Sequence, residues 1–171
     1  MIKSNESKYF AAVDSREAAL TELSQKVWEY AEPGLQEKQS AKAIADYLES
    51  EGFRVQRGVG TIPTAICAEY GSGHPVIAYL GEYDALARLD QKVVTHKEAA
   101  HPEEPDRYGH GCGHNNLGVG AVGAAIMLKE AIAAGEVKGT VRFYGCPAEE
   151  TLVGKVFMVR DGAFKDVDCA M

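Results

Sequence analysis

Cysteine, histidine and glutamate side chains lie in two short glycine-containing segments that could bind one metal ion together. The first segment carries Cys112 and His114 on either side of a glycine, and the second carries the adjacent residues Glu149 and Glu150. A thiolate and an imidazole two residues apart can face one cation when the backbone between them is extended, and the glycines let that backbone bend without a Cβ clash. Thiolate sulfur and imidazole nitrogen suit zinc and its neighbours, and carboxylates complete such mixed shells. The pattern therefore predicts part of a metallohydrolase site, in which one glutamate is a ligand and the other accepts a proton.

Cys112 and the histidines around it also have simpler interpretations. Free cysteine behaves as a small buried hydrophobic residue, and that interpretation is preferred for Cys67 in its apolar run and for Cys169 near the end of the chain. Cys112 differs because histidine and glycine flank it on both sides, which favours ligation. His114 could instead cap the following helix. His110 could support a ligand, face the substrate or be an ordinary loop histidine.

The acidic residues near the two strand ends also have both a structural and a functional interpretation. Adjacent glutamates such as Glu149 and Glu150 are commonly a solvated acidic pair, but these two directly follow a predicted strand and a Gly-Cys-Pro turn. Asp84 follows another predicted strand, where an aspartate often caps a helix, and Glu82 could be only a turn residue. Because ligands bind at the carboxyl ends of strands in parallel α/β sheets, we expect Asp84 and the glutamate pair to meet at one edge.

Hydrophobic periodicity predicts the elements that must position these residues. A first helix is expected to begin at a capping residue, Asp14 or Ser15, and to end at Pro33. Its apolar face is formed by Leu20, Leu23, Val27 and Ala31. A second helix is expected to end at Gly52 in a left-handed cap. Its apolar face is formed by Ala41, Ile44, Tyr47 and Leu48.

Short runs of β-prone residues and one long apolar helix complete the predicted domain. The runs cover 53–55, 64–68, 76–80 and 141–144, and residues 166–171 are expected to open a further buried strand. A buried helix is expected over 117–134, closed by Gly135, and the polar stretch 88–108 is expected to be a long loop. This alternation predicts a three-layer α/β/α fold around a mostly parallel central sheet.

Composition narrows the classes of function. The chain has 171 residues, 46% of them hydrophobic and 25% charged, which is typical of a folded globular domain. Its net charge of −7 argues against nucleic acid and anionic membrane as partners, because no basic stripe relieves it. The polar amino terminus lacks the apolar core of a signal peptide, and the 4 cysteines form no paired framework, so we expect a reducing cytoplasm.

Four segments of the chain, in the same order and spacing, resemble the metal-dependent amidohydrolases of peptidase family M20. They read GEYDAL from position 81, HGCGHN from 110, GCPAEE from 145, and GKVFMVRDG from 154 with DVD at 166. The resemblance runs over nearly the whole chain and is stronger after position 76. Within the family it points to the subgroup containing the B subunit of aminobenzoyl-glutamate hydrolase. Each motif alone is weak evidence, but four in order are specific.

The resemblance implies a role for each candidate residue. The implied metal ligands are Cys112, His114 and Glu150. The implied catalytic residues are Glu149, as general base, and Asp84. The residues left to support the ligands or the substrate are His110, Glu82 and Asn115. The cofactor would be a divalent metal, zinc or manganese, with one or two ions in the complete enzyme. Many relatives have a histidine ligand where this chain has Glu82, which puts the second metal position in question.

The resemblance also implies a substrate class, a cellular setting and a partner. The substrate would be a small amide such as aminobenzoyl-glutamate, a dipeptide or an N-acyl amino acid. Residues 1–171 would form the amino-terminal portion of the catalytic domain, without the lid and dimerisation domain, and would be inactive alone. A homo-oligomer or a complementary chain is expected as partner. Two alternatives stay open: a truncated domain that only binds metal or a partner chain, and an amidase with Cys112 as nucleophile.

Overall fold

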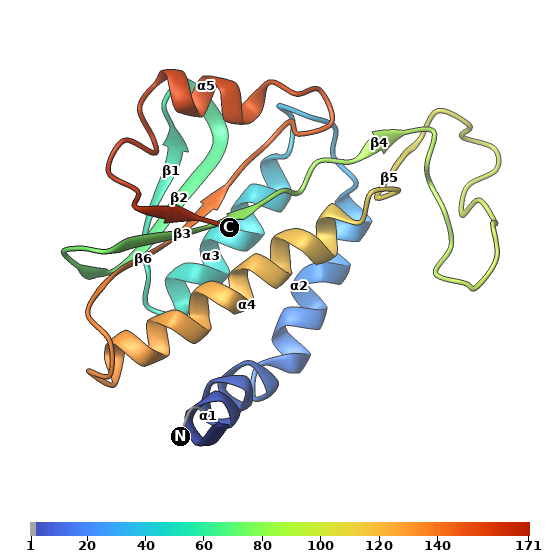
Figure 1. Ribbon diagram of the computed structural model, residues 1–171. Helices are drawn as coiled ribbons and strands as arrows, with labels where there is room; N and C mark the ends of the chain where they lie inside the picture. Colours follow the sequence, from blue (N-terminus) through green and yellow to red (C-terminus); the bar gives the residue numbers. More distant parts are fainter. Residues whose placement is uncertain (1–2) are drawn as a thin grey trace.

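A mixed five-stranded sheet lies between helices in the computed structural model, which describes residues 3–171, with side chains from residue 8 onward (Figure 1). The helices are α1 (Lys3–Asp14), α2 (Glu17–Tyr30), α3 (Lys38–Ser50), α4 (His114–Ala133) and α5 (Gly154–Arg160). The strands of this sheet are β1 (Arg54–Val59), β2 (Ile62–Ser72), β3 (Val76–Gly81), β6 (Gly139–Gly145) and β7 (Cys169–Ala170). Two short strands, β4 (Leu86–Ala87) and β5 (Tyr108–Gly109), pair with each other outside it.

Four of the five strands run in the same direction. The order across the sheet is β1-β2-β6-β3-β7, in which β3 is parallel to both β6 and β7. Strand β2 is antiparallel to its neighbours β1 and β6, so it alone in this sheet runs the other way. The predicted α/β class with a mostly parallel sheet is confirmed. The strand predicted within 166–171 is present as β7, but its predicted burial is wrong, because both of its residues are exposed at the sheet edge.

Helices cover both faces of the sheet, which makes the three predicted layers (Figure 1). On one face, α2, α3 and α4 share a core with β2 and β6, in which Val27, Ile44 and Ile126 are fully buried. On the other face, α5 and the segment after it pack on Ala65, Ala78 and Tyr144 through Met158 and Phe164. Burial of aliphatic and aromatic surface on both faces stabilises the sheet.

Helix α3 follows its predicted pattern from start to end. Its apolar face is buried, with Ile44 and Leu48 fully inaccessible. Gly52 has a φ of +86°, and the amides of Gly52 and Phe53 donate hydrogen bonds to the carbonyls of Glu49 and Leu48. This is the pairing of a Schellman cap, in which the buried residue Phe53 packs on the end of the helix.

The predicted start of α2 is wrong. The helix begins after Arg16, which makes no capping hydrogen bond with its side chain, and neither Asp14 nor Ser15 is the cap. Residues 3–14 form a helix of their own, α1, so Asp14 ends that helix and the Ser15 hydroxyl donates back to the carbonyl of Ala12. The end of α2 lies close to the prediction, because Ala31 takes a left-handed conformation just before Pro33.

Helix α4 is the central helix of the larger core. By length and composition it could cross a membrane, with 20 residues and a mean hydropathy of 1.3. It packs on β3 and β6, however, and Val122, Ala125 and Ile126 are fully buried, as in a core helix of a globular protein. A Cβ on Gly118 would lie 2.3 Å from the carbonyl oxygen of Glu82, so this glycine lets α4 approach the end of β3.

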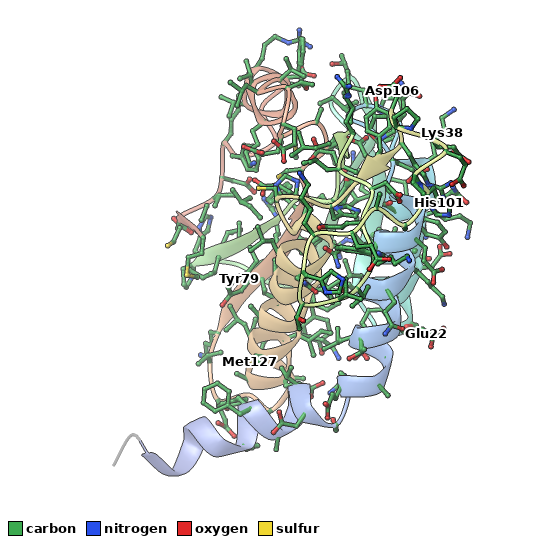
Figure 2. All side chains as sticks on the ribbon, turned by 90° about the vertical axis from the view of Figure 1, so that its right-hand side faces the viewer. Glu22, Lys38, Tyr79, His101, Asp106 and Met127 are labelled. Atoms are coloured by element: carbon green, nitrogen blue, oxygen red, sulfur yellow. The ribbon has the colours of Figure 1, made fainter. Side chains whose placement is uncertain are left out.

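The polar stretch between β4 and β5 forms the predicted long loop. Figure 2 looks onto this loop, with His101 and Asp106 labelled. Asp90 anchors it from inside, because its carboxylate accepts a 2.7 Å hydrogen bond from the backbone amide of His101 and lies 3.6 Å from Arg107. The β4–β5 pair closes the base of the loop beside the start of α4.

Candidate metal centre

Four segments bring polar side chains to the carboxyl edge of the sheet. Glu82 and Asp84 follow β3, Glu149 and Glu150 follow β6, and His114 is the first residue of α4. Strands β3 and β6 are parallel neighbours paired to their last residues, so their following loops meet, as the sequence predicted.

His114 is buried and oriented by Asp84. The two residues are 2% and 1% exposed, and the histidine Nδ1 lies 3.0 Å from Asp84 Oδ1 and 3.1 Å from the Asp84 carbonyl oxygen. Because both neighbours are acceptors, Nδ1 carries the proton and Nε2 is left with a free lone pair. Carboxylates fix metal-binding histidines in this way.

Neighbouring groups shift the pKa of both residues. Burial alone would lower the pKa of His114, but the hydrogen bond and charge of Asp84, with the charge of Glu82, raise it overall. Burial likewise opposes ionisation of Asp84, yet the hydrogen bond from His114 and the backbone amide of Glu150 bring its pKa below the usual value. The site is therefore strongly acidic and attracts cations.

The free nitrogen of His114 faces three carboxylates. Its Nε2 lies 3.4 Å from Glu82 Oε2, 3.6 Å from Glu149 Oε2 and 3.9 Å from Glu150 Oε1. Two sets of side chains could each hold a metal ion, because within each set the donor atoms all lie within 4.8 Å of one another. One set is Cys112, His114 and Glu150, and the other is Glu82, His114 and Glu149. Ligands of one tetrahedral zinc ion are roughly 3.3–3.8 Å apart, given bonds of about 2.0–2.3 Å. The geometry is close to a coordination shell.

The surroundings of Glu150 give separate support for a metal ion at this site. Its backbone amide donates a 3.0 Å hydrogen bond to Asp84 Oδ2, so Asp84 holds both His114 and Glu150. The Glu150 Oε1 atom is buried and has no hydrogen-bond partner among the described residues. A buried carboxylate oxygen without a donor is costly unless something satisfies it. A divalent cation held by Cys112, His114 and Glu150 would do so.

Cys112 itself is exposed, in contrast to Cys146, which is buried. Local desolvation and the carboxylates of Glu150, Glu149 and Glu82 raise the pKa of the Cys112 thiol. Gly113, with a φ of +78°, turns the chain between this thiol and His114 into α4. The interpretation of Cys169 as a buried thiol is wrong, because the edge strand leaves it exposed, and Cys67 is partly buried as expected.

His110 and Asn115 point to α2. The His110 Nε2 donates to the carbonyl of Val27 at 2.9 Å, and the ring stacks on Trp28 at 6.2 Å between centroids. Asn115 donates to the hydroxyl of Ser24 at 3.0 Å. Burial lowers the pKa of His110 below its ordinary value. Both residues tie the segment 110–115 to α2, which fits a supporting role.

The sequence patterns did not predict a role for Glu37, which holds the turn before the glutamate pair. Glu37 is 0% exposed, and its Oε1 accepts hydrogen bonds from the backbone amides of Ala148 at 2.8 Å and Leu35 at 2.9 Å. Its Oε2 accepts the hydroxyl of Thr64 at 2.9 Å. Ala148 has a φ of +55°, a conformation that alanine rarely adopts. Glu37 thus stabilises a strained turn that aims Glu149 and Glu150 at His114.

Lys155 is a second residue whose role the sequence patterns did not predict. It lies in the first turn of α5, and its ammonium group pairs with Glu82 Oε1. The only signal in the sequence was a lysine shortly after the glutamate pair, within the GKVFMVRDG segment.

This fold and this donor set define a class of α/β metallohydrolases. No family model matches the chain. A curated relative, the B subunit of p-aminobenzoyl-glutamate hydrolase from Escherichia coli, is 48% identical over 162 residues, covering 94% of this chain and 33% of its own length. The mouse Xaa-Arg dipeptidase is 28% identical over 169 residues, covering 91% of this chain and 35% of its own length.

A solved structure extends the similarity to the fold. A Bacillus subtilis dinuclear metal-binding peptidase from the M20 family superposes with a TM-score of 0.72 at 30% identity, covering 90% of this chain and 42% of that one. The chain therefore belongs to the M20 family of peptidases. It spans about one third of the length of the curated relatives that it matches.

Proposed function

We propose that this chain carries the metal ligands and the general base of an enzyme that hydrolyses an amide bond in a small substrate. The observation that supports this proposal most strongly is the convergence of Cys112, Glu149 and Glu150 on the free nitrogen of His114. Cys112, His114 and Glu150 would hold a divalent ion, zinc or manganese. That ion would supply Lewis acidity, which polarises a carbonyl and lowers the pKa of water.

Glu149 is suited to the proton transfers. Its carboxylate is half-buried, with 31% side-chain exposure, and lies beside the ligands without being held by a described hydrogen bond. Glu149 takes a proton from the attacking water as oxygen adds to the carbonyl carbon. It then returns the proton to the amide nitrogen as the carbon–nitrogen bond breaks, which leaves a carboxylic acid and an amine. Asp84 keeps His114 in the required tautomer throughout.

The names of the relatives support a proposal for the substrate and the partner of this chain. Their names describe an aminobenzoyl-glutamate hydrolase and a dipeptidase, so we propose aminobenzoyl-glutamate, a dipeptide or an N-acyl amino acid as substrate. The name of the bacterial relative describes one subunit of a hydrolase, which supports a complementary chain or a second copy as partner. The cytoplasmic location stays a prediction.

A cysteine-nucleophile amidase is the second candidate. One observation favours it, because Cys112, His114 and Asp84 are arranged as a thiol, an imidazole and an orienting carboxylate. The surroundings of the thiol oppose it, since carboxylates raise the pKa of Cys112 whereas a nucleophile needs a lowered one. The two are separated by alkylation: iodoacetamide should modify Cys112 readily in chelated protein and slowly once zinc is bound. Equal rates would favour the nucleophile.

The roles of the two glutamates can be tested by substitution in a complete, active form of the enzyme. Glu149→Gln should keep the bound metal and abolish turnover, whereas Glu150→Gln should weaken metal binding itself. Elemental analysis and an amide-hydrolysis assay give both quantities. The opposite pattern would reverse the assignment.

We also propose that the 171-residue chain alone binds metal but does not turn over. These 171 residues span about one third of the length of the curated relatives. Positioning of substrate can supply roughly 7–11 kcal/mol of barrier reduction, which an open site forgoes. The test is hydrolysis of aminobenzoyl-glutamate and N-acyl amino acids with added zinc, manganese or cobalt. Metal-dependent turnover that Glu149→Gln abolishes would refute this proposal.

A further inference from the structure

The ion pair between Lys155 and Glu82 lies at the edge of the candidate metal centre. It joins the first turn of α5 to the loop after β3, and both side chains are partly buried, at 35% and 22% exposure. The ammonium group contacts Glu82 Oε1, while Glu82 Oε2 faces His114 Nε2 at 3.4 Å. One carboxylate of the proposed site thus already has a cation beside it.

The two donor sets cannot both be filled by metal ions, because they share the Nε2 atom of His114. Both contain His114, whose Nδ1 is taken up by Asp84, so only Nε2 is left to bind an ion. A nitrogen lone pair coordinates a single metal ion. An ion bound through Cys112 and Glu150 therefore deprives the other set of its histidine, and a second ion would have only Glu82 and Glu149 from that set.

The two donor sets differ in how far the negative charge of their carboxylates is already compensated. The carboxylates of Glu82, Glu149 and Glu150 crowd around His114 Nε2, and like charges at such distances disfavour one another unless a cation compensates them. Lys155 compensates Glu82 directly. Glu150 has no such partner among the described residues, and its Oε1 is buried and unsatisfied.

We propose that Lys155 is a built-in counterion for Glu82, which directs a single ion to Cys112, His114 and Glu150 and excludes a second ion from the side of Glu82 and Glu149. This inference rests on the proposed function, since it requires a metal-binding site. It separates this chain from the dinuclear Bacillus subtilis neighbour. Removing the charge of Lys155 should open the second position, where two carboxylates and water suit a hard cation.

The test is cobalt binding by the full 171-residue chain, measured by elemental analysis after equilibrium dialysis and by the thiolate-to-cobalt charge-transfer band. Lys155→Met keeps the apolar stem and removes the charge. Lys155→Arg keeps the charge. Lys165→Met is the matched control, because Lys165 is an exposed lysine just after α5.

The wild type, Lys155→Arg and Lys165→Met should each bind one cobalt ion and show the thiolate band. Lys155→Met should bind a second, weaker equivalent with no further increase in that band. Two ions in the wild type, or one in Lys155→Met that is folded by circular dichroism, would overturn the role of Lys155 and leave the proposed function intact. No cobalt in any of the proteins would overturn both.

Discussion

The helical cover is much thicker on one face of the sheet than on the other (Figure 1). The candidate metal centre lies at the carboxyl edge of the sheet, where residues from both covers meet. One face carries three helices, and residues of α4 such as Val122 and Ile126 are completely buried. The other face carries α5, a helix of 7 residues, and the irregular segment after it. Met158 of α5 is buried, but Val156 and Val159 are 64% and 63% exposed.

This difference divides the centre into a firmly held part and a loosely held part. His114 begins the deeply packed helix and is fixed by Asp84, whereas Lys155 belongs to the thinly covered helix. Segments with few buried apolar contacts open locally at lower free energy than core elements. We therefore expect the orientation of His114 to survive perturbations that release Lys155 from Glu82.

The largest effect should come from removing the atom that both donor sets share. His114→Ala should reduce bound zinc or manganese to background, because no other described imidazole faces the carboxylates. Cys112→Ser should lower the metal content less, since His114 and the glutamates remain. Cys67→Ser, on the far strand β2, should change nothing. Equal metal content in all three variants, by elemental analysis, would contradict the ligand set.

Core substitutions on the two faces compare their packing directly. Ile126→Ala in α4 should lower the free energy of unfolding near the top of the roughly 2–5 kcal/mol range for such deletions, because the site cannot collapse. Met158→Ala in α5 should lie near the bottom of that range. The exposed residue Val156 provides a control, and Val156→Ala should stay within about 0.5 kcal/mol. Urea unfolding measures all three, and a larger loss for Met158→Ala would reverse the comparison.

Asp84→Asn tests how firmly His114 is held. The amide keeps the shape but loses the charge that orients the imidazole, and loss of such partners typically weakens metal binding about 10–100-fold. Isothermal titration with zinc gives the affinity. A matched substitution, Asp90→Asn, removes a similar carboxylate that anchors the 88–107 loop instead, and it should leave the affinity unchanged. Equal losses would indicate a general effect of acidic charge.

The smallest effect concerns the pH dependence of stability through Glu37. Burial raises the pKa of Glu37 above its ordinary value of 4.5, so the folded chain binds this proton more tightly than the unfolded chain. Its contribution to stability is therefore full below pH 4.5 and is lost as the pH rises toward the folded-state pKa. Glu37→Gln should flatten this part of the profile in urea unfolding from about pH 4 to about pH 7. An unchanged slope would show that Glu37 stays ionised throughout.

Local patterns predicted most of the fold. The face of α3, its cap at Gly52 and the strands β2, β3 and β6 follow from spacing and turn residues, which act within a few positions. Helix α1 was not expected, because its polar sequence has no apolar stripe, and its presence displaced the expected cap of α2. Its side chains find their partners far away in the chain, as in the hydrogen bond between Tyr9 and Glu136.

The donors of the site could be named from the sequence, but their supports could not. Cys112, His114 and the glutamate pair stand out because these residue types are close in sequence. Glu37 meets Ala148 across 111 residues, and Lys155 meets Glu82 across 73. Such contacts depend on the order of strands in the sheet, which hydrophobic periodicity does not specify. A buried glutamate is also rarely expected, because burial of a charge is costly.

Asp84 accepts hydrogen bonds from the ring of His114 with one oxygen and from the backbone of Glu150 with the other. Because Asp84 orients two of the proposed ligands, binding of the proposed metal ion would be coupled to folding of the chain. A ligand that binds only the native state stabilises it by RT ln(1 + [L]/Kd), which is about 2.7 kcal/mol at a hundredfold excess over Kd. Chelation should therefore lower the melting temperature of the whole chain, and the available metal would regulate how much folded protein persists.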